Sequence, residues 1–257
     1  MKVSRAQRTL KLTIAYDGTH YAGWQRQDVP RAAGPRPPTI QAALERVLRR
    51  ILQERVTVVG SGRTDSGVHA LAQVAHVRAS TSLPPATVQR ALNSLLPPDI
   101  AVTQVQRAPK TFHARFSAKR KRYRYRLVVG PCPSPFNRHY AYHVRAPLNV
   151  AAMRQAARWL KGRHDFRPFQ AAGTRVTATV RHVTDARWLA RDGEWWFEIE
   201  ADGFLYKMVR RIAGTLVDIG RGKHAPALIR HMLQTGDTRR VGPTLPPHGL
   251  VLVSVTY

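Results

Sequence analysis

The first half of the chain alternates short strand patterns with amphipathic helix patterns. Apolar and polar residues alternate in a half-buried strand, whereas apolar residues recur three and four positions apart along a helix that packs one face on a core. In chain order, these patterns predict strand 11–16, helix 40–51, strand 55–59, strand 73–78 and helix 86–96. Thr39 has a side chain suited to cap the first helix, and Pro97-Pro98 ends the second.

The second half repeats this mixture of strands and helices. The predicted elements are strand 120–129, helix 149–160, strands 183–190 and 195–201, helix 206–219 and a final strand 250–257. Asp192-Gly193 suits a tight hairpin turn, and the helix at 149–160 is expected to close at Gly162 in a left-handed cap. Hairpin-connected strands with helices in both halves predict an α+β fold. We expect an N-terminal domain at 1–112 and a C-terminal domain at 113–257.

The chain is strongly basic. Its 257 residues include 42 Lys and Arg against 15 Asp and Glu, a formal net charge of +27 with His neutral. A content of 43% hydrophobic and 22% charged residues is typical of a folded soluble protein rather than a disordered polycation. Such a charge indicates a polyanionic partner, either nucleic acid or an anionic membrane surface.

Several classes of protein are disfavoured by what the sequence contains. It shows neither a spanning run of about 18 apolar residues nor a signal-type apolar core, so we expect a soluble, cytoplasmic protein. A single cysteine, Cys132, excludes an intramolecular disulfide and multi-thiolate zinc sites, and we expect His139 and His143 to be solvated or hydrogen-bonded rather than metal ligands. Residues 29–38 hold four prolines and a glycine and predict a surface loop.

The most unusual segment is GSGRTDSGVHA, at residues 60–70. Its glycines follow a predicted strand and indicate a sharp turn. It is not a P-loop, because Val68 and His69 stand where Lys and Ser or Thr are needed, and it is not a dinucleotide fingerprint, because Asp65 replaces the third glycine. On the residues alone, Asp65 is either the first residue of a structural Asx turn or a functional carboxylate with Arg63 beside it.

This segment resembles the active-site signature of the tRNA pseudouridine synthase A family, which usually reads GAGRTDAGVH. Other blocks occur in the family's order: YDG at 16–18, GWQRQ at 23–27, FHARF at 112–116, KRYRY at 121–125, FLYKMVR at 204–210 and Gly249-Leu250. Ser61 and Ser66 replace the usual alanines at nearly the same volume, and the loop at 29–38 is long for the family.

The resemblance implies a fold of two RNP-like or ferredoxin-like α+β domains with mainly antiparallel sheets, and an active-site cleft between them. It implies an RNA-modifying isomerase that needs no cofactor and no metal. Such an enzyme breaks the N1–C1′ bond of uridines 38, 39 and 40 in the anticodon arm of tRNA, turns the uracil and rejoins it through C5. The family also implies a homodimer that binds one tRNA across both subunits. We expect no membrane contact and predict no other protein partner.

By the same resemblance, Asp65 is the essential catalytic carboxylate. Whether it attacks the ribose C1′, attacks the base or removes a ribose proton stays open. Tyr123 is expected to stack on the uracil with its hydroxyl near C5, although strand periodicity alone favours a half-buried sheet aromatic. Arg210 is expected to pair with the catalytic carboxylate, although by sequence alone it is a solvated helix residue. Arg63 either adds a second cation or fills the space left by the flipped base.

Phosphate contacts are expected from basic side chains around the predicted strand 120–129 and from nearby blocks, with a solvated face as the alternative for several of them. These candidates are Arg26, Arg115, Lys119, Arg120, Arg122, Arg124, Arg126 and Lys207. A non-catalytic RNA-binding or ribosome-assembly protein would also explain the charge, and it would tolerate the loss of Asp65. A phosphate-ester enzyme would need a metal-binding carboxylate cluster or a Lys-bearing loop, and the sequence shows neither.

Overall fold

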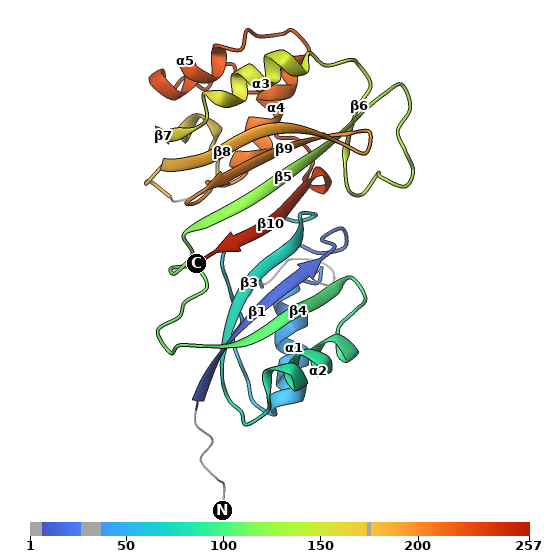
Figure 1. The fold of residues 1–257 in the computed structure, drawn as a ribbon, viewed down its shortest axis with the longest axis vertical. Helices are drawn as coiled ribbons and strands as arrows, with labels where there is room; N and C mark the ends of the chain where they lie inside the picture. Colours follow the sequence, from blue (N-terminus) through green and yellow to red (C-terminus); the bar gives the residue numbers. More distant parts are fainter. Residues whose placement is uncertain (1–6, 27–36, 174–175) are drawn as a thin grey trace, which may run out of the picture. The chain divides into compact units, whose positions relative to one another are not determined.

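The computed structural model describes residues 7–26, 37–173 and 176–257 (Figure 1). The chain forms two compact units: Met1–Lys119 with Leu252–Tyr257 make up the first, and Arg120–Val251 the second. The last six residues therefore group with the N-terminal unit, and the domain boundary expected after residue 112 stays a prediction. Most of the proline-rich run at 29–38 lies outside the described residues.

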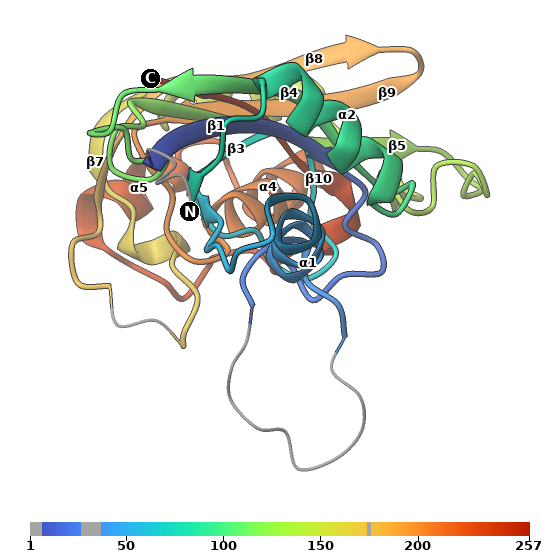
Figure 2. The same cartoon turned by 90° about the horizontal axis from the view of Figure 1, so that it is seen from below.

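The first unit is a mainly antiparallel sheet with its two helices on one face (Figures 1 and 2). Its elements are β1 (Gln7–Tyr16), α1 (Ile40–Leu52), β2 (Val59–Gly60), β3 (His69–Ser80), α2 (Pro85–Leu95), β4 (Ile100–Ala108) and the end of β10 (Leu250–Thr256). The strand order is β4-β1-β3-β10, with β2 beside β3, and β1 is antiparallel to both of its neighbours. The helices contact each other, and α2 packs on β4.

The patterns at the start of the chain produce these elements directly. In β1, Leu10, Leu12 and Ile14 are buried, because alternate side chains of a strand point to the same face. The Thr39 hydroxyl accepts a hydrogen bond of 3.3 Å from the backbone N–H of Ala42, which confirms the predicted cap of α1. Strand 11–16 and helix 40–51 are thus confirmed, with the strand beginning earlier than predicted.

The strand predicted at 55–59 is wrong for most of its length. Only Val59 and Gly60 pair with β3, opposite His76 and Ala75. The backbone N–H of Val58 donates to the Glu45 carboxylate of α1 at 3.0 Å. A side chain of the helix therefore takes the donor that a sheet partner would otherwise have taken, and the β-rich composition of this run does not produce a strand.

His76, in β3, anchors the segment that follows β4. Its Nδ1 accepts a hydrogen bond of 3.1 Å from the backbone N–H of Ala114, which requires that nitrogen to be unprotonated. His76 is 4% exposed. Burial, together with the charges of His113 and Arg78, lowers the pKa of His76 to about 4. The ring is therefore neutral at pH 7.

This lowered pKa predicts a loss of stability in mild acid. Below a pH of about 6.5 the unfolded chain binds a proton at His76 that the folded chain does not bind, so the free energy of unfolding falls until the pH reaches about 4. His76→Asn keeps an acceptor near the Ala114 N–H but does not titrate. Thermal unfolding at several pH values should show the wild-type midpoint falling more steeply than that of the variant between pH 6.5 and pH 4. Parallel curves would contradict the assignment.

The second unit is also a sheet with its helices on one face (Figure 2). Its elements are β5 (Arg120–Val129), β6 (Tyr142–Val144), α3 (Val150–Arg158), β7 (Gly162–Asp165), η1 (Arg167–Phe169), β8 (Val180–Arg191), β9 (Glu194–Ala201), α4 (Met208–Gly220), α5 (Leu228–Thr235) and η2 (Pro247–Gly249). The order is β5-β9-β8-β7, with each strand antiparallel to the next, and β6 pairs with β5 in parallel. The α+β class predicted from the sequence is confirmed.

The hairpin predicted at Asp192-Gly193 is confirmed, and the cap predicted at Gly162 is wrong. Both hairpin residues have positive φ, +49° and +77°, as the tight turn between β8 and β9 requires. Helix α3 ends at Arg158, and Trp159 keeps a right-handed conformation. Bonds to the third residue back, such as Leu160 N–H to Ala157 C=O at 3.1 Å, close its last turn. Gly162 does have a positive φ, +111°, but it begins β7 and does not cap the helix.

None of the helices in the described part of the chain is both long and apolar enough to cross a membrane.

Candidate active site

Asp65 lies on the turn between β2 and β3, and backbone contacts hold the residues on both sides of it. The Thr64 carbonyl accepts a bond of 3.2 Å from the Trp24 N–H, and the Ser66 hydroxyl donates to the Tyr21 carbonyl at 3.1 Å. The Thr64 hydroxyl is also 2.8 Å from the buried hydroxyl of Tyr16. Both neighbours of Asp65 are therefore bonded to the segment at 16–24, which holds the backbone that carries the Asp65 carboxylate.

The turn does not depend on an Asx bond between Asp65 and Gly67. The Val68 N–H closes it on the backbone carbonyl of Asp65 at 3.2 Å, and the Gly67 N–H donates to the Tyr21 carbonyl at 3.3 Å. In an Asx turn, the carboxylate would instead take the bond from Gly67. This arrangement favours the functional reading of Asp65 over the structural one.

Two glycines allow the blocks at 16–18 and 23–27 to pack against this turn. A Cβ added at Gly18 would lie 2.1 Å from the Val68 carbonyl oxygen, and one added at Gly23 would lie 2.4 Å from the Thr64 carbonyl oxygen. Gly23 also has a φ of +87°, which side-chain-bearing residues rarely adopt. The two sequence blocks are therefore parts of one local structure that surrounds Asp65.

Arg63 and Arg26 differ in how they are held. Arg63 is exposed and makes no hydrogen bond or ion pair within the part of the chain that the structure describes. Arg26 Nη1 lies 2.7 Å from the nearly buried carboxylate of Glu45 in α1, and its side chain is half exposed. Arg63 can therefore reorient toward a ligand at little cost, whereas Arg26 would have to give up an ion pair.

The other catalytic candidates lie in the second unit. Tyr123, in β5, is 8% exposed, and its ring meets Phe204 edge-on at 5.0 Å between centroids. Both aromatics come from blocks singled out in the sequence. Lys207 adopts a left-handed conformation at the start of α4, and its Nζ lies 4.9 Å from the Tyr206 ring centroid. Strand periodicity predicted a half-buried aromatic at Tyr123, and the structure shows a side chain that is almost fully buried.

Arg210 is buried rather than solvated. It lies in the first turns of α4, is 9% exposed, and donates from Nε to the Leu245 carbonyl at 2.7 Å. Burial raises the pKa of Tyr125, while the charge of Arg210 acts to lower it. A buried guanidinium is costly unless it is bonded, and the bond to the Leu245 carbonyl offsets part of this cost. The prediction of a solvated helix residue at this position, made from the sequence alone, was wrong.

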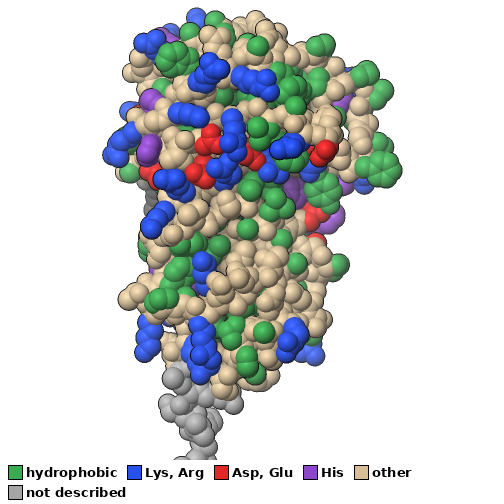
Figure 3. Space-filling view, in the orientation of Figure 1, with side chains coloured by type: hydrophobic (Ala, Val, Ile, Leu, Met, Phe, Trp, Pro, Cys, Tyr) green, Lys and Arg blue, Asp and Glu red, His purple; other side chains and the backbone are tan. Residues whose placement is uncertain are grey.

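Arginines that were predicted to contact phosphate form ion pairs on the sheet face opposite the helices (Figure 3). In the β5–β9 register, Arg122 stands opposite Glu200 and Arg124 opposite Glu198. Arg122 Nη2 lies 3.0 Å from Glu200, and Arg124 Nη2 lies 2.7 Å from Glu198. We call this set the arginine–carboxylate ladder; its members are Arg122, Arg124, Arg126, Asp185, Arg187, Glu194, Glu198 and Glu200.

Glu198 joins three arginines of the ladder. It is 4% exposed and receives hydrogen bonds from Arg122, Arg124 and Arg187. Burial acts to raise the pKa of Glu198, but the bonds from Arg124 and Arg187 outweigh it, and the pKa lies below its ordinary value. The ladder arginines therefore have partners within the fold, and a phosphate would have to compete with these carboxylates.

Removing the central carboxylate should destabilise the second unit. Glu198→Ala removes the carboxylate that pairs with the part-buried Arg124 and takes one of several partners from Arg122 and Arg187, so it is expected to lower the free energy of unfolding by about 2–3 kcal/mol. Arg120→Gln is a matched control, because the Arg120 side chain is 55% exposed and lies 3.8 Å from Glu200, so its loss should cost less than about 0.5 kcal/mol. Urea unfolding measures both, and equal effects would contradict the structural role of the ladder.

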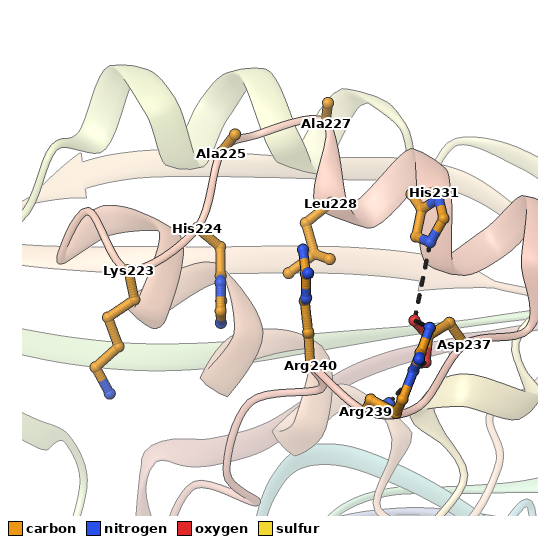
Figure 4. A pocket seen from close by; sticks show the side chains of 9 residues that line it. All are labelled: Lys223, His224, Ala225, Ala227, Leu228, His231, Asp237, Arg239 and Arg240. Carbon is orange, nitrogen blue, oxygen red and sulfur yellow. Dashed lines mark hydrogen bonds and ion pairs between the residues drawn. The ribbon is translucent and has the colours of Figure 1, made fainter.

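A second basic feature is a pocket of about 470 Å³ beside the start of α5 (Figure 4). Arg239 holds Asp237 with two bonds of 3.0 Å, and His231 Nε2 is 3.8 Å from the same carboxylate. Arg240 makes no hydrogen bond or ion pair within the described residues, and its side chain extends toward Leu228 (Figure 4). The cationic lining suits an anion such as phosphate. Sequence reasoning missed this pocket because no motif covers 223–240.

Within the described ranges, no cluster of three or more His, Cys, Asp or Glu side chains is arranged to hold a metal ion. His143, one of the two histidines considered above, hydrogen-bonds the Gly130 carbonyl at 2.7 Å, which confirms that it is a satisfied side chain.

The segments that build these features match a known family. The family model described as tRNA pseudouridine synthase matches residues 12–117 and 156–257. The chain belongs to the tRNA pseudouridine synthase family. The tRNA pseudouridine synthase A of Bacillus subtilis is 46% identical over 250 residues, covering 96% of this chain and 98% of that protein. Those of Exiguobacterium sp. and Moorella thermoacetica are both 45% identical, covering 97% and 96% of this chain and 98% and 99% of theirs.

The ranges matched by the tRNA pseudouridine synthase model include Asp65, Arg63 and Arg210, whereas Tyr123 lies between them. Asp65 and Arg63 belong to the first unit of this tRNA pseudouridine synthase, and Tyr123, Lys207 and Arg210 belong to the second. The resemblance read from the sequence is confirmed at the level of the family.

Proposed function

We propose that this tRNA pseudouridine synthase converts uridines 38, 39 and 40 of the tRNA anticodon arm to pseudouridine through the carboxylate of Asp65. The observation that carries the proposal is the turn at Asp65, which closes on a backbone carbonyl and is bonded on both sides to Tyr21 and Trp24, so that the backbone carrying this carboxylate is held. Family membership supports tRNA as the substrate. In the reaction, the N1–C1′ bond breaks, a C5–C1′ bond forms, C5 loses a proton and N1 gains one.

The proposed roles of the residues follow from their chemistry. Ionised Asp65 acts on the ribose C1′, on the base or on a ribose proton, and each role needs a charged, positioned carboxylate. Arg210 supplies a buried cation that pairs with this carboxylate, and the Tyr123 hydroxyl acts near C5. Tyr123 and Arg210 are both buried, which supports a role inside the active site rather than nonspecific electrostatic binding of RNA. Exposed Arg63 fills the space left by the flipped uridine.

We further propose that tRNA is held mainly through exposed cations such as Arg115 and Lys119, which precede β5. Phosphate contacts by Arg26, Arg122 and Arg124 stay predictions, and their ion pairs weigh against them. The affinity for tRNA should fall as the salt concentration rises, because each phosphate contact releases counterions from the RNA.

A homodimer that binds one tRNA across both subunits is part of the proposal and has its own test. Sedimentation at the concentration used for activity should give twice the mass of 28.9 kDa. A monomer that works at full rate would contradict this part and leave the assignment of Asp65 intact.

The experiment that tests the proposal uses unmodified tRNA transcripts whose anticodon arms carry one uridine, at position 38, 39 or 40. Each transcript is incubated with the purified protein, without added metal or nucleotide, and pseudouridine is mapped at single-nucleotide resolution. We expect modification of all three transcripts and none of a transcript lacking these uridines. Binding without modification would contradict the proposal and favour a non-catalytic RNA-binding protein.

A further inference from the structure

One exposed aromatic side chain of the first unit has no assigned role. Phe116 lies on the turn after β4 and is 77% exposed. A single exposed apolar residue is ordinary on a protein surface. Phe116 differs from an ordinary case because its backbone and its ring are both fixed by neighbouring groups.

The backbone of the turn at 113–117 is held by a histidine. His113 Nδ1 accepts hydrogen bonds from the N–H groups of Arg115 and Phe116, at 3.2 and 3.3 Å. The backbone N–H of His113 donates to the Ser117 hydroxyl at 3.1 Å, and the backbone N–H of Ser117 donates to the His113 carbonyl at 2.9 Å. Residues 113 and 117, at the two ends of the turn, therefore each donate a hydrogen bond to the other.

The centre of this turn is fixed to the sheet. Ala114 is buried, its N–H donates to His76 in β3, and its carbonyl accepts a bond of 2.8 Å from the Tyr257 hydroxyl. The exposed ring at position 116 thus projects from an anchored segment.

The Phe116 ring is supported by the same neighbours. The centroid of the His113 ring lies 4.4 Å from that of Phe116, with 32° between the planes, and the Arg115 guanidinium carbon lies 5.6 Å from the Phe116 centroid. Nearby, Lys11 Nζ lies 5.6 Å from the Phe112 ring and 4.5 Å from the Tyr257 ring. Cations interleaved with aromatic rings are the composition of surfaces that bind unpaired nucleotides.

Phe136 provides an internal comparison. It is 89% exposed, yet within the described residues it has no ring contact and no cation contact. Exposure alone therefore does not explain the arrangement around Phe116. A ring that is held before binding loses little conformational entropy when a ligand covers it.

We propose that the Phe116 ring is a stacking platform for an unpaired base of the RNA, with the Arg115 guanidinium on a neighbouring phosphate. The inference rests on the proposed function, because it takes tRNA as the ligand. Every base presents a π-face, so the platform tolerates any sequence and adds affinity without selecting a base. Its contribution is apolar and does not depend on salt, whereas that of Arg115 does.

The test measures tRNA binding from about 50 to 200 mM salt in a background that carries Asp65→Asn, so that no turnover occurs. Phe116→Ala should weaken binding roughly 5- to 150-fold at every salt concentration and leave the salt slope unchanged. Phe116→Trp should restore binding, whereas Phe116→Leu, which is apolar but has no π-face, should not. Arg115→Gln should reduce the slope by roughly 0.7 to 0.9, and Phe136→Ala should bind as the background does.

Three results would overturn the platform. They are unchanged binding by Phe116→Ala, full binding by Phe116→Leu, and a fall in sedimenting mass with Phe116→Ala, which would assign the ring to a contact between copies of this chain. Failure of the proposed function is distinguishable, because it would appear as absent pseudouridine with the wild-type protein, whatever the affinities of the variants at position 116.

Discussion

Asp65→Asn is expected to abolish pseudouridine formation, with a fall in rate of roughly four orders of magnitude or more. Asparagine has nearly the same shape as aspartate, and the turn is closed by the backbone carbonyl of residue 65, so the local fold should persist. Without the charge, residue 65 can neither attack nor remove a proton. Binding of tRNA should be unchanged or slightly tighter, because a negative charge near a polyanion is lost. Single-turnover rates with saturating enzyme measure the effect.

Ser66→Ala is the matched control for this variant. It removes one bond, from the Ser66 hydroxyl to the Tyr21 carbonyl, and places the residue that the family signature usually carries at this position. Its rate should stay within a few-fold of wild type. An Asp65→Asn protein that retains more than about a tenth of the wild-type rate would assign the chemistry to another group.

Gly23→Ala is expected to have the second-largest effect, at a residue that is not a catalytic candidate. Its Cβ would lie 2.4 Å from the Thr64 carbonyl oxygen and 3.0 Å from the Asp65 carbonyl carbon, and the residue would keep a φ of +87°. The turn at Asp65 must then shift. Because a displacement of about 1 Å can cost roughly 100-fold in rate, we expect kcat to fall by about that factor while tRNA affinity changes little.

Gly193→Ala is the control that distinguishes displacement of the Asp65 turn from the effect of backbone strain alone. Gly193 also has positive φ, +77°, but a Cβ there would meet nothing within 4 Å. This variant should lose about 1–2 kcal/mol of stability, because an L-residue is strained at this φ, and keep its rate. If Gly193→Ala slows the reaction as much as Gly23→Ala does, the contact with the Asp65 turn is not the cause.

The elements that local patterns specify were predictable. In β5, alternate residues become the buried Tyr123, Tyr125 and Leu127 and the ion-paired arginines, because a strand has two faces. The turn at Asp192-Gly193 was predictable because few residues tolerate its backbone angles. Elements that depend on a distant partner were not predictable: Val58 bonds to Glu45 instead of to a strand.

The same limit applies to the candidate site. The carboxylates of β9 alternate as the arginines of β5 do, but pairing them requires the register of the two strands, which no single segment carries. The burial of Arg210 depends on Leu245, far along the chain. Asp65 was found through its family signature. The sequence could not distinguish an Asx turn from a functional carboxylate at this position. The bonds that the turn makes to Tyr21 and Trp24 bear on that choice, and they join two distant sequence blocks.

The central claim is that this chain isomerises uridine in the tRNA anticodon arm through Asp65. The most direct measurement maps pseudouridine in one unmodified tRNA transcript after incubation with wild-type protein and with Asp65→Asn, at equal bound fractions of tRNA. We predict pseudouridine at positions 38 to 40 with the wild-type protein and none with the variant. Equal modification by both proteins, or none by either, would contradict the account.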